Sequence, residues 1–317
     1  MSLPQAFAWP TEGVPAWDRP RLPPIPRREL LRSLFFFLLT AVSVFLTGGL
    51  QTREDATGDL VIGISVLAGL KLVAALLTIL LSHEMGHYIA CRYYGVDASL
   101  PYFIPFPLGL AGTMGAFIRI RAPIPHRRAL FDIGIAGPLA GFVVCLPVMF
   151  LAAREGVWST LVNGGEGPGY LGEPLLFSWV VTLLRGPTPE GMTLSIGPLG
   201  MAAWFGLFVT ALNMMPVGQL DGGHVTYALW PRWALSISRA GIVVCLALLY
   251  FRPSWLLWAA LLLLLGRRPH PPTLYDWEAV GRGRLLLGLL GFVIFAVCFT
   301  PSPFMVSWND MLEAFGY

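Results

Sequence analysis

His83, Glu84 and His87 are the residues of this sequence whose types and spacing are best suited to chemistry. On an α-helix, residues four apart lie one turn above each other on the same face, so the two imidazoles can bind one metal ion. Glu84 would lie beside the open coordination position, where a carboxylate can take a proton from a water molecule that attacks a carbonyl group. The pattern predicts metal-assisted hydrolysis. The alternative is that two histidines fall at helical spacing by chance on a solvated helix end.

The sequence before this motif favours the metal site. A continuous apolar run begins near Leu60 and leads directly into the motif, which predicts a helix that starts there and ends in residues 83–88. Polar side chains at the end of such a run are costly in lipid unless they have partners. We therefore expect the two histidines to have a functional role.

The composition indicates a membrane protein with many spans. Of the 317 residues, 56% are hydrophobic and only 12% are charged, and the mean hydropathy is +0.67. The net charge of +3 is spread over loops, which excludes a nucleic-acid-binding protein. The cysteines are far apart along the chain and are expected to be small buried hydrophobic residues. They are Cys91, Cys145, Cys245 and Cys298.

The apolar runs predict an all-α polytopic membrane protein with seven transmembrane helices, or six if two short runs are fused. The predicted spans are residues 31–50, 60–82, 131–153, 194–212, 237–251, 254–266 and 285–300. Arginine clusters flank the first, second and last spans on one side, which predicts a cytoplasmic amino terminus in a cell membrane. We divide the chain into an extended cytoplasmic tail (1–28), a first span with its outer loop (29–59), a catalytic core (60–226) and C-terminal helices with a short tail (227–317).

A second polar cluster follows the fourth predicted span, between Asn213 and His224. With the amino terminus inside, this cluster and the histidine pair reach the same side of the bilayer. Pro216 and Gly218 break the helix there, and free backbone groups at membrane depth require protein or a water-filled cavity around them. Asp221 is therefore a candidate third metal ligand. The alternative is that its Asp-Gly pair forms a turn that leaves the membrane.

The segment between the second and third predicted spans does not read as a helix. Residues 100–109 contain three prolines, whereas Gly115 to Arg121 has the composition of a strand. We expect a short β-hairpin that dips into the membrane and offers its edge to an extended substrate. The alternative is a loop that closes the floor of the cavity.

Three motifs together resemble the site-2 protease family of intramembrane zinc metalloproteases. They are His83-Glu84-x-x-His87, Gly137-Pro138-Leu139-Ala140-Gly141, and Asn213-x-x-Pro216 leading to Leu220-Asp221-Gly222. The resemblance covers roughly residues 60–226 and implies a Zn²⁺ ion held by His83, His87 and Asp221. It also implies that Glu84 is the catalytic base and that Asn213 polarises the scissile carbonyl group or its oxyanion.

Two features refine this resemblance. Many relatives carry a PDZ domain between the third and fourth spans, but residues 154–193 are too few for one, so the chain resembles the PDZ-less members. Many members also have Asn where this chain has Gly141, a difference that we expect to affect helix packing rather than catalysis. Within the outer loop, the apolar piece from Pro174 to Arg185 is too short to cross and is expected to be re-entrant or to lie at the interface.

Together these features predict an intramembrane zinc metalloprotease that cleaves a membrane-protein substrate with a single transmembrane helix, near the cytoplasmic side. A membrane transporter or metal-handling protein is the alternative, but the sequence lacks the paired broken-helix repeat that this class predicts. An inactive scaffold relative is a third hypothesis, although every position that the chemistry needs is present. The oligomeric state is not indicated.

Five further polar residues allow weaker predictions. Lys71 lies about 18 Å from the motif along a helix, so it is no ligand. It either lines a water path, pairs with another span, snorkels, or packs against a carbonyl group. His224 lies either near the metal or at a cytoplasmic helix start. His126 and His270 are expected to be solvated, and Asp132 to cap the third span.

Overall fold

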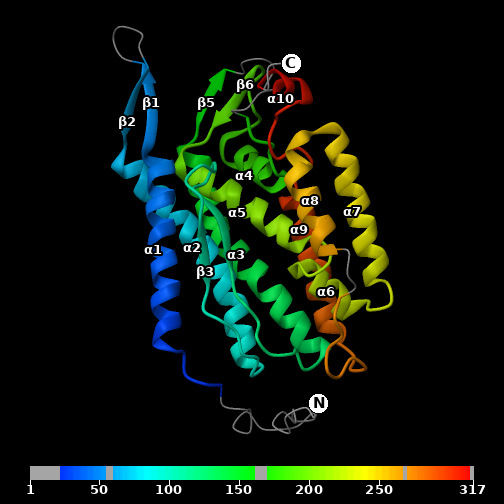
Figure 1. The fold of residues 1–317 in the computed structure, drawn as a ribbon. Coiled ribbons are helices and arrows are strands. Elements are labelled where there is room, and N and C mark those ends of the chain that lie inside the picture. Colours follow the sequence, from blue (N-terminus) through cyan, green and yellow to red (C-terminus); the bar gives the residue numbers. More distant parts are fainter. Residues whose placement is uncertain (1–21, 55–59, 161–169, 267–269, 315–317) are drawn as a thin grey trace.

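The computed structural model describes residues 22–54, 60–160, 170–266 and 270–314, which fold into a helical bundle with small two-stranded sheets (Figure 1). The helices are α1 (Arg27–Gly49), α2 (Val66–Tyr93), α3 (Arg127–Glu155), α4 (Leu175–Arg185), α5 (Pro198–Met214), α6 (Asp221–Leu229), α7 (Ala234–Phe251), η3 (Pro253–Trp255), α8 (Leu256–Gly266), α9 (Arg282–Cys298) and α10 (Trp308–Ala314). The strands are β1 (Leu50–Glu54), β2 (Leu60–Ile64), β3 (Tyr102–Pro105), β4 (Thr113–Phe117), β5 (Val157–Thr160) and β6 (Met192–Ser195). Residues 1–21 of the tail predicted over residues 1–28 lie outside the described residues.

Four helices of the described chain are long and apolar enough to cross a membrane, namely α1, α2, α3 and α7. The chain is therefore a multi-pass membrane protein, as its composition predicts. The other predicted spans correspond to α5, α8 and α9, which have 17, 11 and 17 residues. About 20 residues are needed to cross the hydrocarbon layer without distortion. The count of six or seven spans is not confirmed.

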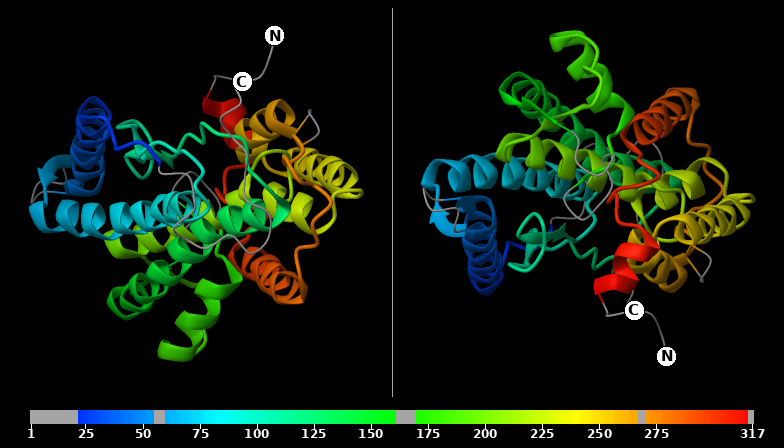
Figure 2. Two further views of the ribbon diagram at one scale, coloured as in Figure 1. Left: turned by 90° about the horizontal axis from the view of Figure 1, so that it is seen from below. Right: turned by 90° about the horizontal axis from the view of Figure 1, so that it is seen from above.

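Helix α2 occupies the centre of the bundle, packed against α1, α3 and α5. Figure 2 shows α1 and the start of α2 at one edge and α7 at the opposite edge, with the rest of α2 and α3 between them. The helix begins at Val66 rather than near Leu60, with Ser65 accepting a hydrogen bond from the Ala68 amide. It also continues past the metal motif to Tyr93. The predicted start and end of this helix are therefore wrong by several residues.

The five residues before the cap residue Ser65 form strand β2 (Leu60–Ile64), which pairs antiparallel with β1. Leu50 lies opposite Ile64, so the two strands extend from the ends of α1 and α2 (Figure 1). A short run rich in Val and Ile is compatible with either a strand or a helix until it finds a pairing partner. The predicted outer loop at 51–59 therefore includes part of a hairpin.

Helices α2 and α3 approach each other closely through glycine. A Cβ atom added to Gly86 would lie 2.4 Å from the carbonyl oxygen of Ala136, which no real side chain could do. On α3, Gly137 and Gly141 have the G-x-x-x-G spacing that lets helix backbones come together in membranes. The glycine motif thus brings the α3 backbone against the face of α2 that carries the two histidines.

The predicted β-hairpin between the second and third spans is present. Strands β3 and β4 pair antiparallel, although β4 ends at Phe117 rather than continuing to Arg121. The hairpin is fastened to α1, since Ser43 donates to the carbonyl oxygen of Gly112 at 2.6 Å and Ser33 to that of Pro101 at 2.6 Å. Its entry into lipid stays a prediction.

The chain breaks between α5 and α6 where Pro216 and Gly218 predict it. Gly218 has φ +55°, and a Cβ on Gly222 would lie 2.0 Å from the carbonyl oxygen of Met214. Only glycine permits this fold-back, which turns the start of α6 towards α2. Asp221 is the first residue of α6 rather than a turn residue.

Two ion pairs bear on the sequence predictions. Lys71 pairs with Glu155 of α3 at 2.8 Å, which is the predicted alternative of a pair with another span. Asp132 does not cap α3, because the helix begins at Arg127; it lies within α3 and accepts two hydrogen bonds from Arg284 of α9, at 2.8 and 2.7 Å. The segment from Pro174 is helix α4, and the four cysteines are free and buried, as predicted.

Candidate metal centre

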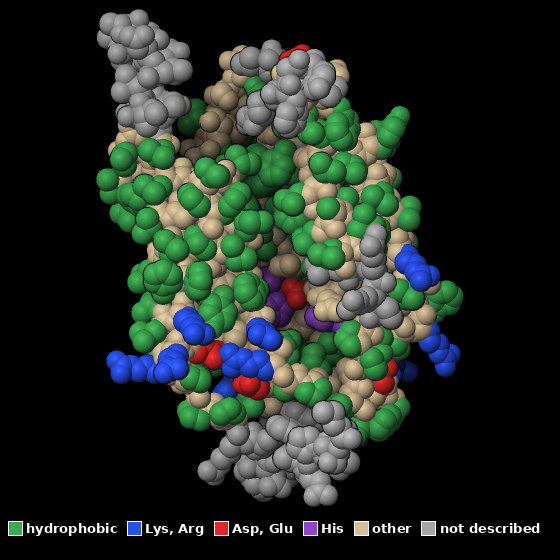
Figure 3. Space-filling model, in the orientation of Figure 1, with side chains coloured by type: hydrophobic (Ala, Val, Ile, Leu, Met, Phe, Trp, Pro, Cys, Tyr) green, Lys and Arg blue, Asp and Glu red, His purple; other side chains and the backbone are tan. Residues whose placement is uncertain are grey.

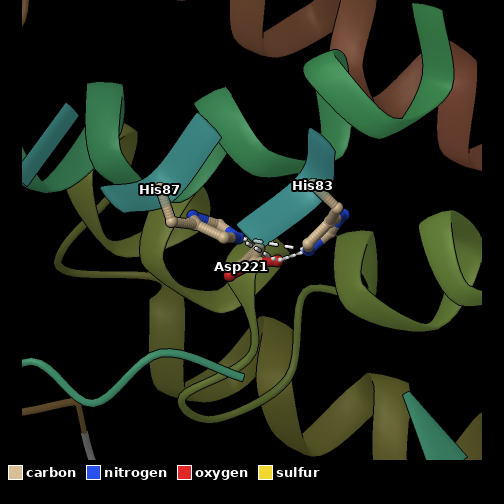
Figure 4. A group of neighbouring side chains, drawn as sticks. All are labelled: His83, His87 and Asp221. Carbon is tan, nitrogen blue, oxygen red and sulfur yellow. Dashed lines mark hydrogen bonds and ion pairs between the residues drawn. The ribbon is translucent and has the colours of Figure 1, made fainter. Parts of the chain in front are cut away.

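The three predicted ligands meet in one place although they come from distant parts of the chain (Figure 4). His83 and His87 lie one turn apart on α2, and Asp221 begins α6. One carboxylate oxygen of Asp221, Oδ2, lies 3.4 Å from Nε2 of His83 and 3.2 Å from Nε2 of His87. The two Nε2 atoms are 3.2 Å apart. Both histidines are buried.

These distances fit a zinc ion. Ligand atoms bound to a tetrahedral zinc at about 2.0–2.1 Å lie about 3.3–3.4 Å from one another. Two imidazoles and one carboxylate also form a zinc donor set that leaves the fourth position for water or substrate. Within the described residues, no further group of three potential ligand atoms is as close together. The cluster therefore fits Zn²⁺ by chemistry and by geometry.

The protonation of His87 is set by the backbone of α3. Its Nδ1 lies 2.7 Å from the carbonyl oxygen of Ile133, which can only accept, so Nδ1 carries the proton and donates it. The lone pair of Nε2 then points towards Asp221 and His83. This is the arrangement in which metal-binding histidines are usually held, because the hydrogen bond fixes both tautomer and ring orientation.

Glycines of α3 leave space for both rings. A Cβ on Gly137 would lie 2.0 Å from Nε2 of His87, and a Cβ on Gly141 would lie 3.1 Å from Cβ of His83. The Gly141 position therefore contacts a predicted ligand as well as packing the helices, which extends the role expected for it. The signal was present in the sequence as the G-x-x-x-G spacing, but the residues that it faces could not be read from it.

Glu84 lies beside the three ligands and faces the same cavity of about 230 Å³. Only 6% of this residue is exposed, and the backbone of Ile118, just after β4, hydrogen-bonds to its carboxyl group. Asn213, in the last turn of α5, places its amide nitrogen 3.2 Å from Nε2 of His83. Figure 3 shows histidine and acidic side chains at the bottom of a hollow between apolar walls.

The prediction that His270 and His126 are solvated is wrong, whereas the predicted alternative of His224 near the metal agrees with the structure. His270 is not simply solvated, since its Nε2 lies 2.6 Å from Nδ1 of His224 and its ring stacks on Tyr227 at 4.5 Å. His224 lines the metal cavity. His126 is half-buried and caps α3 by accepting from the Ala129 amide at 3.0 Å. The sequence separation of 46 residues between His224 and His270 gives no local signal for their pairing.

Comparison with known proteins identifies the family. Residues 71–250 match peptidase family M50, and this segment contains every predicted site residue. The chain belongs to peptidase family M50. The predicted membership in the site-2 protease family is thus confirmed.

Plant proteins are among the relatives of this M50 chain. It is 33% identical over 256 residues to "Probable zinc metalloprotease EGY1, chloroplastic" of Arabidopsis thaliana, covering 78% of this chain and 45% of that protein. It is 29% identical over 323 residues to "Probable zinc metalloprotease EGY2, chloroplastic" of the same plant, covering 94% and 55%. The chain thus spans about half the length of the curated relatives it matches. Neither the family nor these names favours the transporter alternative.

Proposed function

We propose that the chain is an intramembrane zinc endopeptidase that hydrolyses a peptide bond within or near a transmembrane segment of another membrane protein. The observation that carries this proposal is the meeting of three ligand atoms, 3.2–3.4 Å apart, next to the buried carboxylate of Glu84 in a cavity large enough for water. A proteolytic centre needs both parts. The metal activates the attacking water and the scissile carbonyl group, and the carboxylate transfers a proton from the water to the leaving amine.

The proposed mechanism assigns one role to each residue. His83, His87 and Asp221 would hold Zn²⁺, which would supply a Lewis acid for the scissile carbonyl group and for the attacking water. Glu84 takes a proton from the water as its oxygen attacks the scissile carbonyl carbon. The side-chain amide of Asn213 donates to the developing oxyanion. Glu84 then delivers the proton to the leaving amine as the C–N bond breaks, which leaves one new carboxyl end and one new amino end.

In this proposal, strand β4 binds the substrate in an extended conformation. Ala116, Phe117 and Ile118 line the metal cavity, and among the described strands β4 pairs with β3 alone. A helical substrate keeps its peptide groups in its own hydrogen bonds, so the scissile segment must unwind before attack. Addition to a free strand edge would hold it extended and supply replacement hydrogen bonds.

The finer topology is part of the proposal. The apolar runs support six or seven spans, and the arginine distribution supports an amino terminus in the cytoplasm; we propose that the membrane is a cell membrane. The relatives described above are chloroplastic, so a different membrane is a real alternative outcome. We also propose the division into a tail (1–28), a first span (29–59), a catalytic core (60–226) and C-terminal helices (227–317). Reporter fusions within each predicted loop test the orientation.

Cleavage of a single-span substrate by the purified protein tests the proposed chemistry. Wild-type protein should cleave it, and a zinc chelator should stop cleavage. Glu84→Gln should keep its zinc and lose about 10²–10⁴-fold in rate, the usual contribution of a general base. Glu155→Gln is the matched control, because it makes the same change at an exposed site and should retain activity. Undiminished turnover in Glu84→Gln would remove this residue from the mechanism.

Metal analysis tests the ligands separately. Asp221→Asn removes the charged ligand while keeping the side-chain shape, so it should retain less zinc than wild type after dialysis. An unchanged zinc content would argue against Asp221 as a ligand. A wild-type protein with zinc but without chelator-sensitive cleavage would favour the inactive scaffold.

A further inference from the structure

A second cavity, of about 180 Å³, adjoins the metal centre. The two cavities share part of their lining, namely Glu84, Ala116, Asn213 and Leu220. The second cavity therefore opens directly onto the atoms that we assign to catalysis. Any chain held along β4 at the metal would pass its mouth.

The walls of this second cavity are apolar and come from several elements. Strand β4 contributes Met114 and Gly115, α5 contributes Val209 and Leu212, and α8 contributes one large aromatic residue, Trp258. The remaining lining is Leu80, Met215, Leu261 and Leu262. Among the described residues that line it, Glu84 and Asn213 have polar side chains and Trp258 adds one indole N–H. We call it the Trp258 cavity.

We propose that the Trp258 cavity binds a large apolar side chain, such as Leu or Phe, of the substrate residue next to the scissile bond. The proposal rests on the proposed proteolytic function. It commits to this occupant because the cavity shares lining residues with the reacting centre and because, beyond Glu84 and Asn213, its described lining side chains carry no charge and no amide that could pair with a charged side chain. Its volume exceeds the roughly 150 Å³ of a protein cavity that accepts benzene.

The position of Trp258 makes it the residue that limits cavity size. Its ring meets Phe208 of α5 edge to face, with centroids 5.5 Å apart, which holds it in place. The adjacent Leu262 of α8 is buried, with 2% of its surface exposed. Helix α8 lies outside residues 71–250, the segment that matches family M50. The catalytic residues thus belong to the matched segment, whereas one wall of the side-chain cavity does not.

Val209 also lines the Trp258 cavity, one helical turn before Asn213 on α5. A phenylalanine there would extend into space that the substrate side chain is proposed to fill. Alanine at position 258 would have the opposite effect and enlarge the cavity. The two variants therefore make opposite predictions about preferred substrate size.

The experiment measures selectivity rather than activity alone. Wild-type protein, Val209→Phe and Trp258→Ala are assayed against single-span substrates that differ only at the residues flanking the cleaved bond, with Ala, Leu, Phe or Trp there, and mass spectrometry locates the cut. Wild type should prefer Leu or Phe to Ala by at least about 10-fold in kcat/KM. Val209→Phe should lower the Phe-to-Ala ratio at least about 10-fold, and Trp258→Ala should raise the Trp-to-Ala ratio by a similar factor.

Two controls make matched changes outside the cavity. Leu257→Ala truncates an exposed neighbour on α8, and Val243→Phe enlarges an exposed residue of α7. Both should keep the wild-type ratios, and zinc content checks that each variant retains its metal centre. Intact cleavage with the same ratios in all proteins would overturn the side-chain cavity but leave the proteolytic function standing. Absence of chelator-sensitive cleavage by wild type would overturn both.

Discussion

Replacing Gly137 by alanine should displace His87, a proposed zinc ligand, although Gly137 is not itself a proposed ligand. The added Cβ would lie 2.0 Å from Nε2 of His87, which is 1.4 Å closer than the 3.4 Å at which ordinary contact begins. The ring cannot rotate away without losing its 2.7 Å hydrogen bond to the carbonyl oxygen of Ile133. Either the ring moves, or α2 and α3 separate.

Either response would move the His87 ring by more than the variation in ligand distance that a zinc site tolerates. Bond lengths in a zinc site vary by only about 0.2 Å, so a ligand displaced by more than an ångström no longer binds properly. Loss of an outer hydrogen-bond partner alone typically lowers metal affinity by about 10–100-fold. We expect Gly137→Ala to weaken zinc binding by at least about 100-fold.

Zinc retained after equilibration with a chelator series, measured by elemental analysis on purified protein, gives this change directly. Gly283→Ala is the matched control, because it is also a helix glycine and its added Cβ would meet no atom within 4 Å. The control should bind zinc as tightly as wild type. Equal zinc affinity in Gly137→Ala and wild type would refute the conclusion that the α3 backbone packs too closely against His87 to admit a side chain at position 137.

Two further predictions concern stability. Burial lowers the pKa of His126, whose neutral ring accepts a hydrogen bond from the Ala129 amide. Because the pKa in the folded state lies below the unfolded value of about 6.5, the free energy of unfolding should fall as the pH drops below about 6.5. His126→Asn keeps the helix cap, so its thermal unfolding should depend less on pH between pH 8 and 5. Arg284→Gln breaks a half-buried double hydrogen bond to Asp132 and should lower the free energy of unfolding by about 1–2 kcal/mol, whereas Lys71→Gln, at an exposed pair, should cost less than about 1 kcal/mol. Equal losses in both variants would contradict the burial argument.

The sequence by itself determined the features that depend on local periodicity and composition. The pairing of His83 with His87 follows from the helical repeat, and the break after Asn213 follows from Pro216 and the fold-back at Gly218. The membrane class follows from hydropathy, because lipid accepts long apolar helices regardless of their partners. Each of these properties depends only on the local sequence, over about one helical turn or one membrane span.

Tertiary structure decided whatever depends on a partner far along the chain. Leu60 to Ile64 is apolar enough for either a helix or a strand, and only its pairing with β1 made it a strand. The sequence proposed Asp221 as a ligand, but its 3.2 Å approach to His87 exists because glycines let α2, α3 and α6 come together. The His224–His270 contact and the Trp258 cavity have no local signal at all. Residue types can state which chemistry is available, whereas the distances that permit it arise only when distant segments pack.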